Sequence, residues 1–243
     1  MKHIVQFSGG AASAWVAKWV VDRFGKEDTI LLFHDTKSED TDTYRFRRQV
    51  SDLIGVPITD VSDGRDLWQV IDDNHALPSS FMPFCTRILK LEQAEKWYKK
   101  MEADGVDMIH YNGLGIEEYR RVQKAAARAV VSGRTLVMPI VNENVSDVEI
   151  KREIVEEWGI CLPRAYQTLK HNNCIPCFKA GQGHFRAVLR NYPNEFAKAV
   201  EYEEKIGHTV FMDISLKDLA KRWEIQTDFL DDVGNNIPCM CAI

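Results

Sequence analysis

The sequence predicts an α/β fold: a doubly wound, mostly parallel sheet followed by a helical, cysteine-bearing C-terminal elaboration. Short apolar runs alternate with segments of helical periodicity over residues 1–160. A glycine-containing turn, FSGGAAS at residues 7–13, joins the first run to the first such segment. After Gly159 a cysteine-bearing loop and short helical segments replace the alternation. We therefore expect an α/β domain over residues 1–160 and a helical extension over 161–243 packed on it.

The first half of the chain alternates strictly between strand and helix. Residues 4–7 are apolar and β-favouring, and Trp15, Trp19 and Phe24 then recur at helical spacing. The expected elements are, in order, a strand at 4–7, a helix at 13–24, a strand at 29–33, a helix at 43–54, a strand at 57–61 and a helix at 66–73.

The alternation continues to Trp158. Ile88, Trp97 and Met101 lie at helical intervals, and Ser146 with Glu149 forms a capping box that opens a helix. The expected elements are a helix at 87–101, strands at 107–111 and 135–141, a helix at 146–158, helices at 183–190 and 193–206, a short strand at 209–212 and a helix at 216–223.

The composition is that of a globular protein and does not indicate a binding partner. The chain has 243 residues, of which 45% are hydrophobic, so it can bury a substantial core. A net charge of −5 gives no global attraction to nucleic acid or to an anionic membrane. No apolar stretch is long enough for a membrane span or a signal peptide, so we expect a cytoplasmic protein. Its oligomeric state, a homo-oligomer included, is left open.

The turn FSGGAAS is suited to binding an anion. Gly9 and Gly10 lack Cβ atoms, so their backbone N–H groups can approach phosphate oxygens, and Ser8 and Ser13 add hydroxyl groups. The following helix presents the positive end of its dipole. An ordinary strand-to-helix turn is the alternative, and the motif lacks the features of a Walker loop or a dinucleotide fingerprint.

SGGxxS after a first strand resembles the pyrophosphate loop of the ATP pyrophosphatase superfamily, the adenine nucleotide α-hydrolase-like or PP-loop proteins. Four further segments resemble the PAPS reductase-like branch of that superfamily, including phage and bacterial proteins labelled phosphoadenosine phosphosulfate reductase. They are FHDTKSEDTDTYRF at 33–46, CTRILKLEQ at 85–93, NGLGIEEYRR at 112–121 and HNNCIPCFKAGQGHF at 171–185.

The resemblance implies an adenine-nucleotide site, holding either ATP or a sulfated adenine nucleotide. Its implied binding residues are Ser8, Gly9, Gly10, Ser13, Asp35, Arg87, Gly113 and Arg120. Ser8, Asp35 and Arg87 are the implied catalytic residues. Asp35 would contact ribose, adenine or Mg²⁺, although a turn cap within DTKSED is an equal alternative. Arginine suits phosphate or sulfate because it forms bidentate hydrogen bonds.

The six cysteines are expected to serve as metal ligands, catalytic thiols or buried residues in a reducing compartment. The resemblance implies that Cys85, Cys174 and Cys177 bind a [4Fe-4S] cluster, with Zn²⁺ as the alternative. Phe84 stands where the related proteins have another ligand, so Cys239 or Cys241 of the C-terminal PCMCAI is expected to complete the set. Cys161 is expected to be an ordinary buried residue.

Two reactions are compatible with these motifs. The favoured one cleaves ATP between the α and β phosphates, with Mg²⁺, to adenylate an unidentified acceptor for sulfur or nitrogen transfer. The alternative is a PAPS or APS reductase served by a thioredoxin-like reductant, although the Glu-Cys-Gly-x-His tail of that branch is missing. A tRNA or DNA thiolation enzyme is less favoured and depends on the basic stripe Arg120, Lys124 and Arg128. A non-catalytic nucleotide-binding module is the last alternative.

Overall fold

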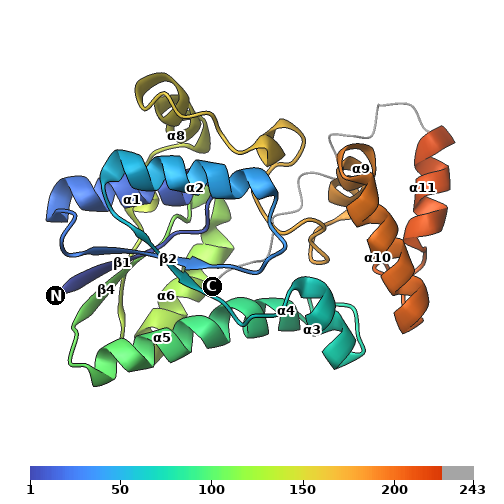
Figure 1. Ribbon diagram of the computed structural model, residues 1–243, viewed down its shortest axis with the longest axis horizontal. Coiled ribbons are helices and arrows are strands. Elements are labelled where there is room, and N and C mark those ends of the chain that lie inside the picture. The colour runs from blue at the N-terminus through green and yellow to red at the C-terminus, as the bar shows by residue number, and fades with distance from the viewer. Residues whose placement is uncertain (226–243) are drawn as a thin grey trace.

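The computed structural model describes residues 1–225 and contains one five-stranded sheet in which every neighbouring pair is parallel (Figure 1). The strands are β1 (Lys2–Gln6), β2 (Thr29–His34), β3 (Ile58–Val61), β4 (Met108–Tyr111) and β5 (Thr135–Val137), in the order β3-β2-β1-β4-β5. The chain leaves β1 toward β2 and later returns to β4 on the other side. This order creates a crevice beyond the carboxyl ends of β1 and β4.

Helices cover both faces of the sheet, which confirms the predicted doubly wound α/β fold. In Figure 1, α1 (Ala11–Phe24) and α2 (Thr41–Ile54) lie over one face, and α5 (Glu92–Ala103) and α6 (Tyr119–Ser132) over the other. The remaining helical elements are α3 (Leu67–Asn74), α4 (Phe84–Thr86), η1 (Arg87–Leu91), η2 (Ile116–Glu118), α7 (Pro139–Glu143), α8 (Asp147–Arg152), η3 (Glu153–Glu157), η4 (Arg164–Gln167), α9 (Gln182–Asn191), α10 (Pro193–Ile206) and α11 (Leu216–Ile225).

Alternating side chains of the central strands build two separate cores. Val5 and Leu31 pack with residues of α1 and α2, whereas Ile4 and Leu32 pack with Ala94 and other residues of α5. Successive side chains of a strand point to opposite faces of the sheet, so a run of apolar residues can serve both layers. This double burial explains why the strands are continuous apolar runs.

Three sequence-based expectations are corrected. The strand expected at 135–141 ends at Val137, because Pro139 occupies the first turn of α7 and cannot donate to a sheet. Residues 209–212 form no strand; an isolated bridge joins Phe211 to Ile214. The helix expected at 87–101 starts with α4 and then the π-helical turn η1, which carries the CTRILKLEQ segment into α5.

The C-terminal elements form a second hydrophobic cluster beside the α/β layers. Phe185, Phe196 and Leu216 from α9, α10 and α11 pack there with Leu67 and Ile71 of α3. The predicted helical character of this part is confirmed, and the division at residue 160 stays a prediction. Within residues 1–225, no helix combines the length and hydrophobicity that crossing a membrane requires.

Candidate functional site

The phosphate loop, residues 8–13, lies between β1 and α1 at the carboxyl edge of the sheet. Gly9 adopts a φ of 77°, a left-handed conformation that favours glycine. Ser13 is buried and ties the loop together: its Oγ accepts a hydrogen bond from the Ser8 backbone N–H at 3.2 Å and donates one to the Gly10 carbonyl at 2.9 Å. The loop is therefore shaped by its own side chains.

Two residues of the C-terminal elaboration also hold this loop. Asn172 donates from Nδ2 to the Gly9 carbonyl oxygen at 2.8 Å, and its Oδ1 accepts from the Thr43 hydroxyl at 3.0 Å. The backbone N–H of Ala11, at the start of α1, donates to the Tyr166 hydroxyl at 3.0 Å. The site is thus built jointly by the first βα unit and by the segment that precedes the CIPC motif.

A cleft of about 140 Å³ separates the phosphate loop from the segment that follows β4. We call it the phosphate-loop cleft; its lining includes Ser8, Gly10, Ser13, Gly113, Glu118, Arg121 and His171. A Cβ atom on residue 113 would lie 3.0 Å from the backbone carbon of Ala12 and 3.0 Å from the backbone nitrogen of Ser13. Only glycine therefore allows the two segments to approach this closely.

The charged groups of the cleft are Arg121 and Glu118, which form an ion pair at one side of it. Burial, followed by the positive charges of Lys170 and Arg121, lowers the pKa of His171, so its imidazole is neutral at pH 7. The neighbouring Arg120, the residue expected from the sequence, is exposed and donates from Nε to the Tyr119 hydroxyl at 3.0 Å. The structure brings Arg121, and not Arg120, to the cleft.

Two other expected residues lie apart from the cleft. The Asp35 carboxylate accepts hydrogen bonds from the Tyr44 hydroxyl at 2.6 Å and from the Lys37 backbone N–H at 2.9 Å. It therefore closes the turn after β2, as the capping alternative predicted. Arg87 has a 58% exposed side chain and pairs with Glu92 at 2.6 Å. Neither residue lines the phosphate-loop cleft.

Three of the expected cysteines gather around one small cavity of about 30 Å³, which we call the thiol cavity. Cys85, Cys174 and Cys177 all line it, although 89 positions separate the first two. The CIPC loop reaches it by docking beyond the end of β2, where the Ile175 N–H donates to the Ser38 carbonyl at 2.8 Å. The Thr36 hydroxyl lies 3.2 Å from the Cys174 sulfur.

Thiolates are the ligands that iron–sulfur clusters and zinc prefer, so the donor type fits the expected metal. Within residues 1–225, however, no group of three or more His, Cys, Asp or Glu side chains is placed closely enough to hold a metal ion. Cys239 and Cys241 lie outside the described residues. His184 bonds locally, because its Nε2 accepts from the Cys177 N–H at 3.0 Å. Cys161, expected to be buried, is exposed on the loop after η3, so that expectation is wrong.

The comparisons with known proteins agree with this geometry. The family model described as the phosphoadenosine phosphosulfate reductase domain matches residues 2–133, which is more than half of the chain. The matched region contains the phosphate loop, the CTRILKLEQ segment and both Gly113 and Arg121. No curated protein sequence matches the chain.

Proposed function

The chain belongs to the phosphoadenosine phosphosulfate reductase domain family, and on this premise we propose that its phosphate-loop cleft binds the phosphates of ATP. Membership supports a nucleotide-binding enzyme of the PP-loop class. The observation that carries the proposal is the contact between the two glycine-containing segments, where Gly113 lies against Ala12 and Ser13 around a cleft that Arg121 also lines.

The phosphates would be held mainly by the backbone. N–H groups at the start of α1 lack partners within the helix and carry its positive dipole end. The Ser8 hydroxyl and the Arg121 guanidinium add side-chain donors, the latter with charge-assisted bonds. At about 140 Å³ the cleft is smaller than the roughly 300–1,000 Å³ of typical small-molecule sites. It therefore suits the phosphates, and the rest of the nucleotide would extend beyond it.

The favoured reaction is cleavage of ATP between its α and β phosphates. An acceptor oxygen bonds to the α-phosphorus while the bond from that phosphorus to the bridging oxygen breaks, so pyrophosphate leaves and the acceptor becomes adenylated. Negative charge grows on the departing pyrophosphate, where the amides of the phosphate loop and Arg121 would stabilise it. Mg²⁺ bound to the nucleotide would neutralise further charge. Sulfur or nitrogen of the donor then attacks the activated atom of the adenylated acceptor, the bond from that atom to the adenylate oxygen breaks, and AMP leaves.

Reduction of a sulfated adenine nucleotide is the second candidate, favoured by the family match and by the three cysteines around the thiol cavity. In this reaction a thiolate attacks the sulfate sulfur, the nucleoside phosphate leaves, and a thioredoxin-like dithiol supplies the two electrons that release sulfite. For either reaction, a [4Fe-4S] cluster, or Zn²⁺ as the alternative, would be held by Cys85, Cys174 and Cys177 together with Cys239 or Cys241. The three described thiols would have to move closer together than they lie in the structure, and no step of either reaction is assigned to the metal.

Pyrophosphate release from ATP and Mg²⁺ tests the first reaction, and sulfite release from PAPS with thioredoxin tests the second. Gly9→Ala places a Cβ 2.7 Å from the Thr43 Cγ2 atom and strains a positive φ, so it is expected to weaken ATP binding at least about tenfold. Gly207→Ala is the matched control, because it carries the same φ strain in open space at the end of α10. A titration that detects neither ATP nor pyrophosphate binding to the wild type overturns the proposal.

A further inference from the structure

Tyr166 of η4 places a phenol hydroxyl at the start of α1, where the phosphates are proposed to bind. The hydroxyl accepts a hydrogen bond from the Ala11 backbone N–H at 3.0 Å, and a Cβ atom on residue 10 would lie 3.0 Å from the hydroxyl oxygen. Tyr166 and Gly10 both line the phosphate-loop cleft. The hydroxyl therefore lies beside the two residues that open the helix, in the wall of the cleft.

This hydroxyl still has a proton to donate. A phenol hydroxyl carries one donor in addition to the lone pairs that accept. The bond from Ala11 uses a lone pair, and within residues 1–225 the Tyr166 hydroxyl makes no other hydrogen bond. An anion that enters the cleft would supply the acceptor for this proton.

The phenol stays neutral at pH 7, so it does not repel an anion. Burial raises the pKa of Tyr166 to about 12, and the bond from the Ala11 N–H opposes this rise only in part. The Ala11 N–H belongs to the positive end of the α1 dipole. A hydroxyl that accepts such a bond is polarised and becomes a better donor. Through Tyr166, the positive end of α1 therefore reaches one hydrogen bond further into the cleft.

The position of the hydroxyl is fixed by its surroundings. The Tyr166 ring packs against the core built by β1, α1 and α2, and the Lys151 ammonium lies 4.6 Å from the ring centroid. Arg164, at the start of η4, pairs with the Asp40 carboxylate at 2.9 Å, and its backbone N–H donates to the Asp42 carboxylate at 2.8 Å. These bonds hold η4 against the start of α2. The donor is thus preorganised before a ligand arrives.

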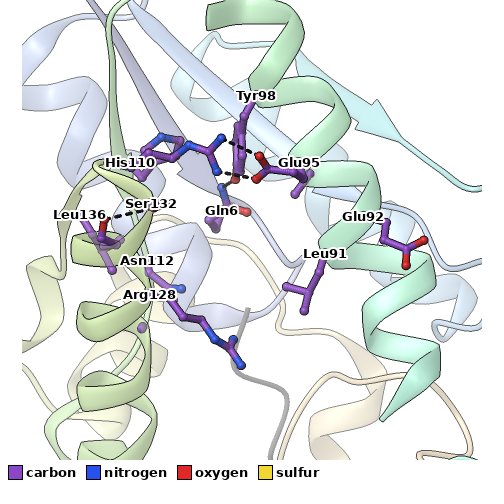
Figure 2. A pocket seen from close by; sticks show the side chains of 14 residues that line it. Gln6, Leu91, Glu92, Glu95, Tyr98, His110, Asn112, Arg128, Ser132 and Leu136 are labelled. Carbon is purple, nitrogen blue, oxygen red and sulfur yellow. Dashed lines mark hydrogen bonds and ion pairs between the residues drawn. The ribbon is translucent and has the colours of Figure 1, made fainter.

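A second cavity, of about 420 Å³, lies between α5 and α6 and shares Gln6 and Asn112 with the phosphate-loop cleft (Figure 2). Among the described residues that line it, none belongs to the phosphate loop, and Tyr166 is absent as well. It holds another buried phenol, Tyr98, whose hydroxyl accepts a hydrogen bond from the Gln6 side-chain amide. Tyr98 therefore provides a matched hydroxyl outside the phosphate-loop cleft.

We infer that Tyr166 contacts the nucleotide directly and donates its hydroxyl proton in a hydrogen bond to a phosphate oxygen, while it accepts the bond from the Ala11 N–H. This assignment rests on the proposed function, because it requires phosphates in the cleft. A hydrogen bond to a charged oxygen is stronger than one between neutral groups. The phenol keeps its proton throughout, so its role is to bind and orient the phosphates.

Inorganic pyrophosphate, titrated calorimetrically into the full chain, is the probe. Tyr166→Phe removes the hydroxyl and is expected to weaken pyrophosphate binding about tenfold. Tyr98→Phe makes the same chemical change in the other cavity and is expected to stay within about twofold of the wild type. Circular dichroism and urea unfolding check that both variants fold.

Replacement of Tyr166 by 3-fluorotyrosine separates donation to phosphate from support of the loop. Fluorine makes the hydroxyl a stronger donor and a weaker acceptor, so this protein is expected to bind pyrophosphate at least as tightly as the wild type. Weaker binding would mean that the hydroxyl acts only by holding the Ala11 N–H, and it overturns the inference.

Unchanged or tighter binding by Tyr166→Phe also overturns the inference, because the hydroxyl would then merely occupy the place of a phosphate oxygen. Both of these results leave the proposed function standing, since the wild type binds pyrophosphate in each. The absence of pyrophosphate binding to the wild type is a different result, which overturns the proposed function and the role of Tyr166 together.

Discussion

Asn172 donates a hydrogen bond to the carbonyl oxygen of Gly9 across 163 positions of sequence, at a distance of 2.8 Å. The same side chain accepts a bond from Thr43 of α2, so one buried amide connects the phosphate loop, the second helix and the segment that leads into the CIPC motif. The shape of the loop therefore depends on a residue that lies outside the region matched by the family model.

Asn172→Ala removes both of these bonds and leaves the Gly9 carbonyl without its amide donor. We expect the free energy of unfolding to fall by about 1–3 kcal/mol and the affinity for ATP to fall about tenfold. Urea unfolding and calorimetry measure the two effects. Asn142→Ala, at an exposed position of α7, is the control and is expected to change neither. Wild-type ATP affinity in Asn172→Ala would show that the loop keeps its shape without this bond.

Arg120 and Arg121 provide a matched pair that tests which side chain serves the nucleotide. Arg121→Ala is expected to weaken pyrophosphate binding about tenfold, because it removes the guanidinium that lines the cleft. Arg120→Ala is expected to leave binding unchanged, because Arg120 is exposed and lies against Tyr119. Titration of both variants with pyrophosphate decides between them, and the reverse order of effects would return the role to Arg120.

The thiol cavity is tested by the metal content of protein purified without oxygen. Cys174→Ser is expected to lose most of the bound iron and the broad visible absorbance of an iron–sulfur cluster, because a hydroxyl is a poor ligand for a soft metal. Cys161→Ser, at an exposed cysteine away from the cavity, is expected to keep the wild-type iron content. Zinc in place of iron would support the alternative metal, and a metal-free wild type would contradict both.

The sequence predicted the parts of the molecule that local patterns encode. Apolar runs of four to six residues and the FSGGAAS turn specify β1, its neighbours and the phosphate loop, because strand and turn chemistry depends on adjacent residues. The strand expected to continue beyond Val137 was wrong. The apolar run favoured a longer strand, whereas Pro139 is a local signal for the start of a helix, and α7 begins there. Cys85, Cys174 and Cys177 were grouped from motif resemblance, and they line one cavity.

No local sequence pattern identified the other residues that complete the phosphate-loop cleft. Tyr166 reaches the Ala11 N–H across 155 positions, and neither a spacing rule nor a motif connects the two residues. Arg121 and Arg120 are adjacent, so the sequence offered both to phosphate equally, and the direction of the first turn of α6 decides which one lines the cleft. Gln6 is a polar residue at the end of a strand, and nothing in its neighbouring sequence marks it. Its place between two cavities follows from the tertiary packing of segments that lie far apart in the sequence.

His110 predicts a loss of stability in acid. Its pKa lies near 4 in the folded protein, against an ordinary value of 6.5, because burial disfavours the charged ring. Below pH 6.5 the unfolded chain binds a proton that the folded chain does not, so the stabilisation is complete above pH 6.5 and is lost as the pH falls toward 4. This site accounts for a loss of up to about 2 kcal/mol in the free energy of unfolding between pH 7 and pH 5.

His110→Phe keeps an aromatic ring against Tyr98 and removes the titration. Urea unfolding at the two pH values is therefore expected to show a smaller loss of unfolding free energy in the variant than in the wild type. Other buried histidines, such as His34 with its pKa lowered to about 3, retain part of the loss in the variant. Equal losses in the two proteins would mean that His110 can accept a proton without leaving its buried position.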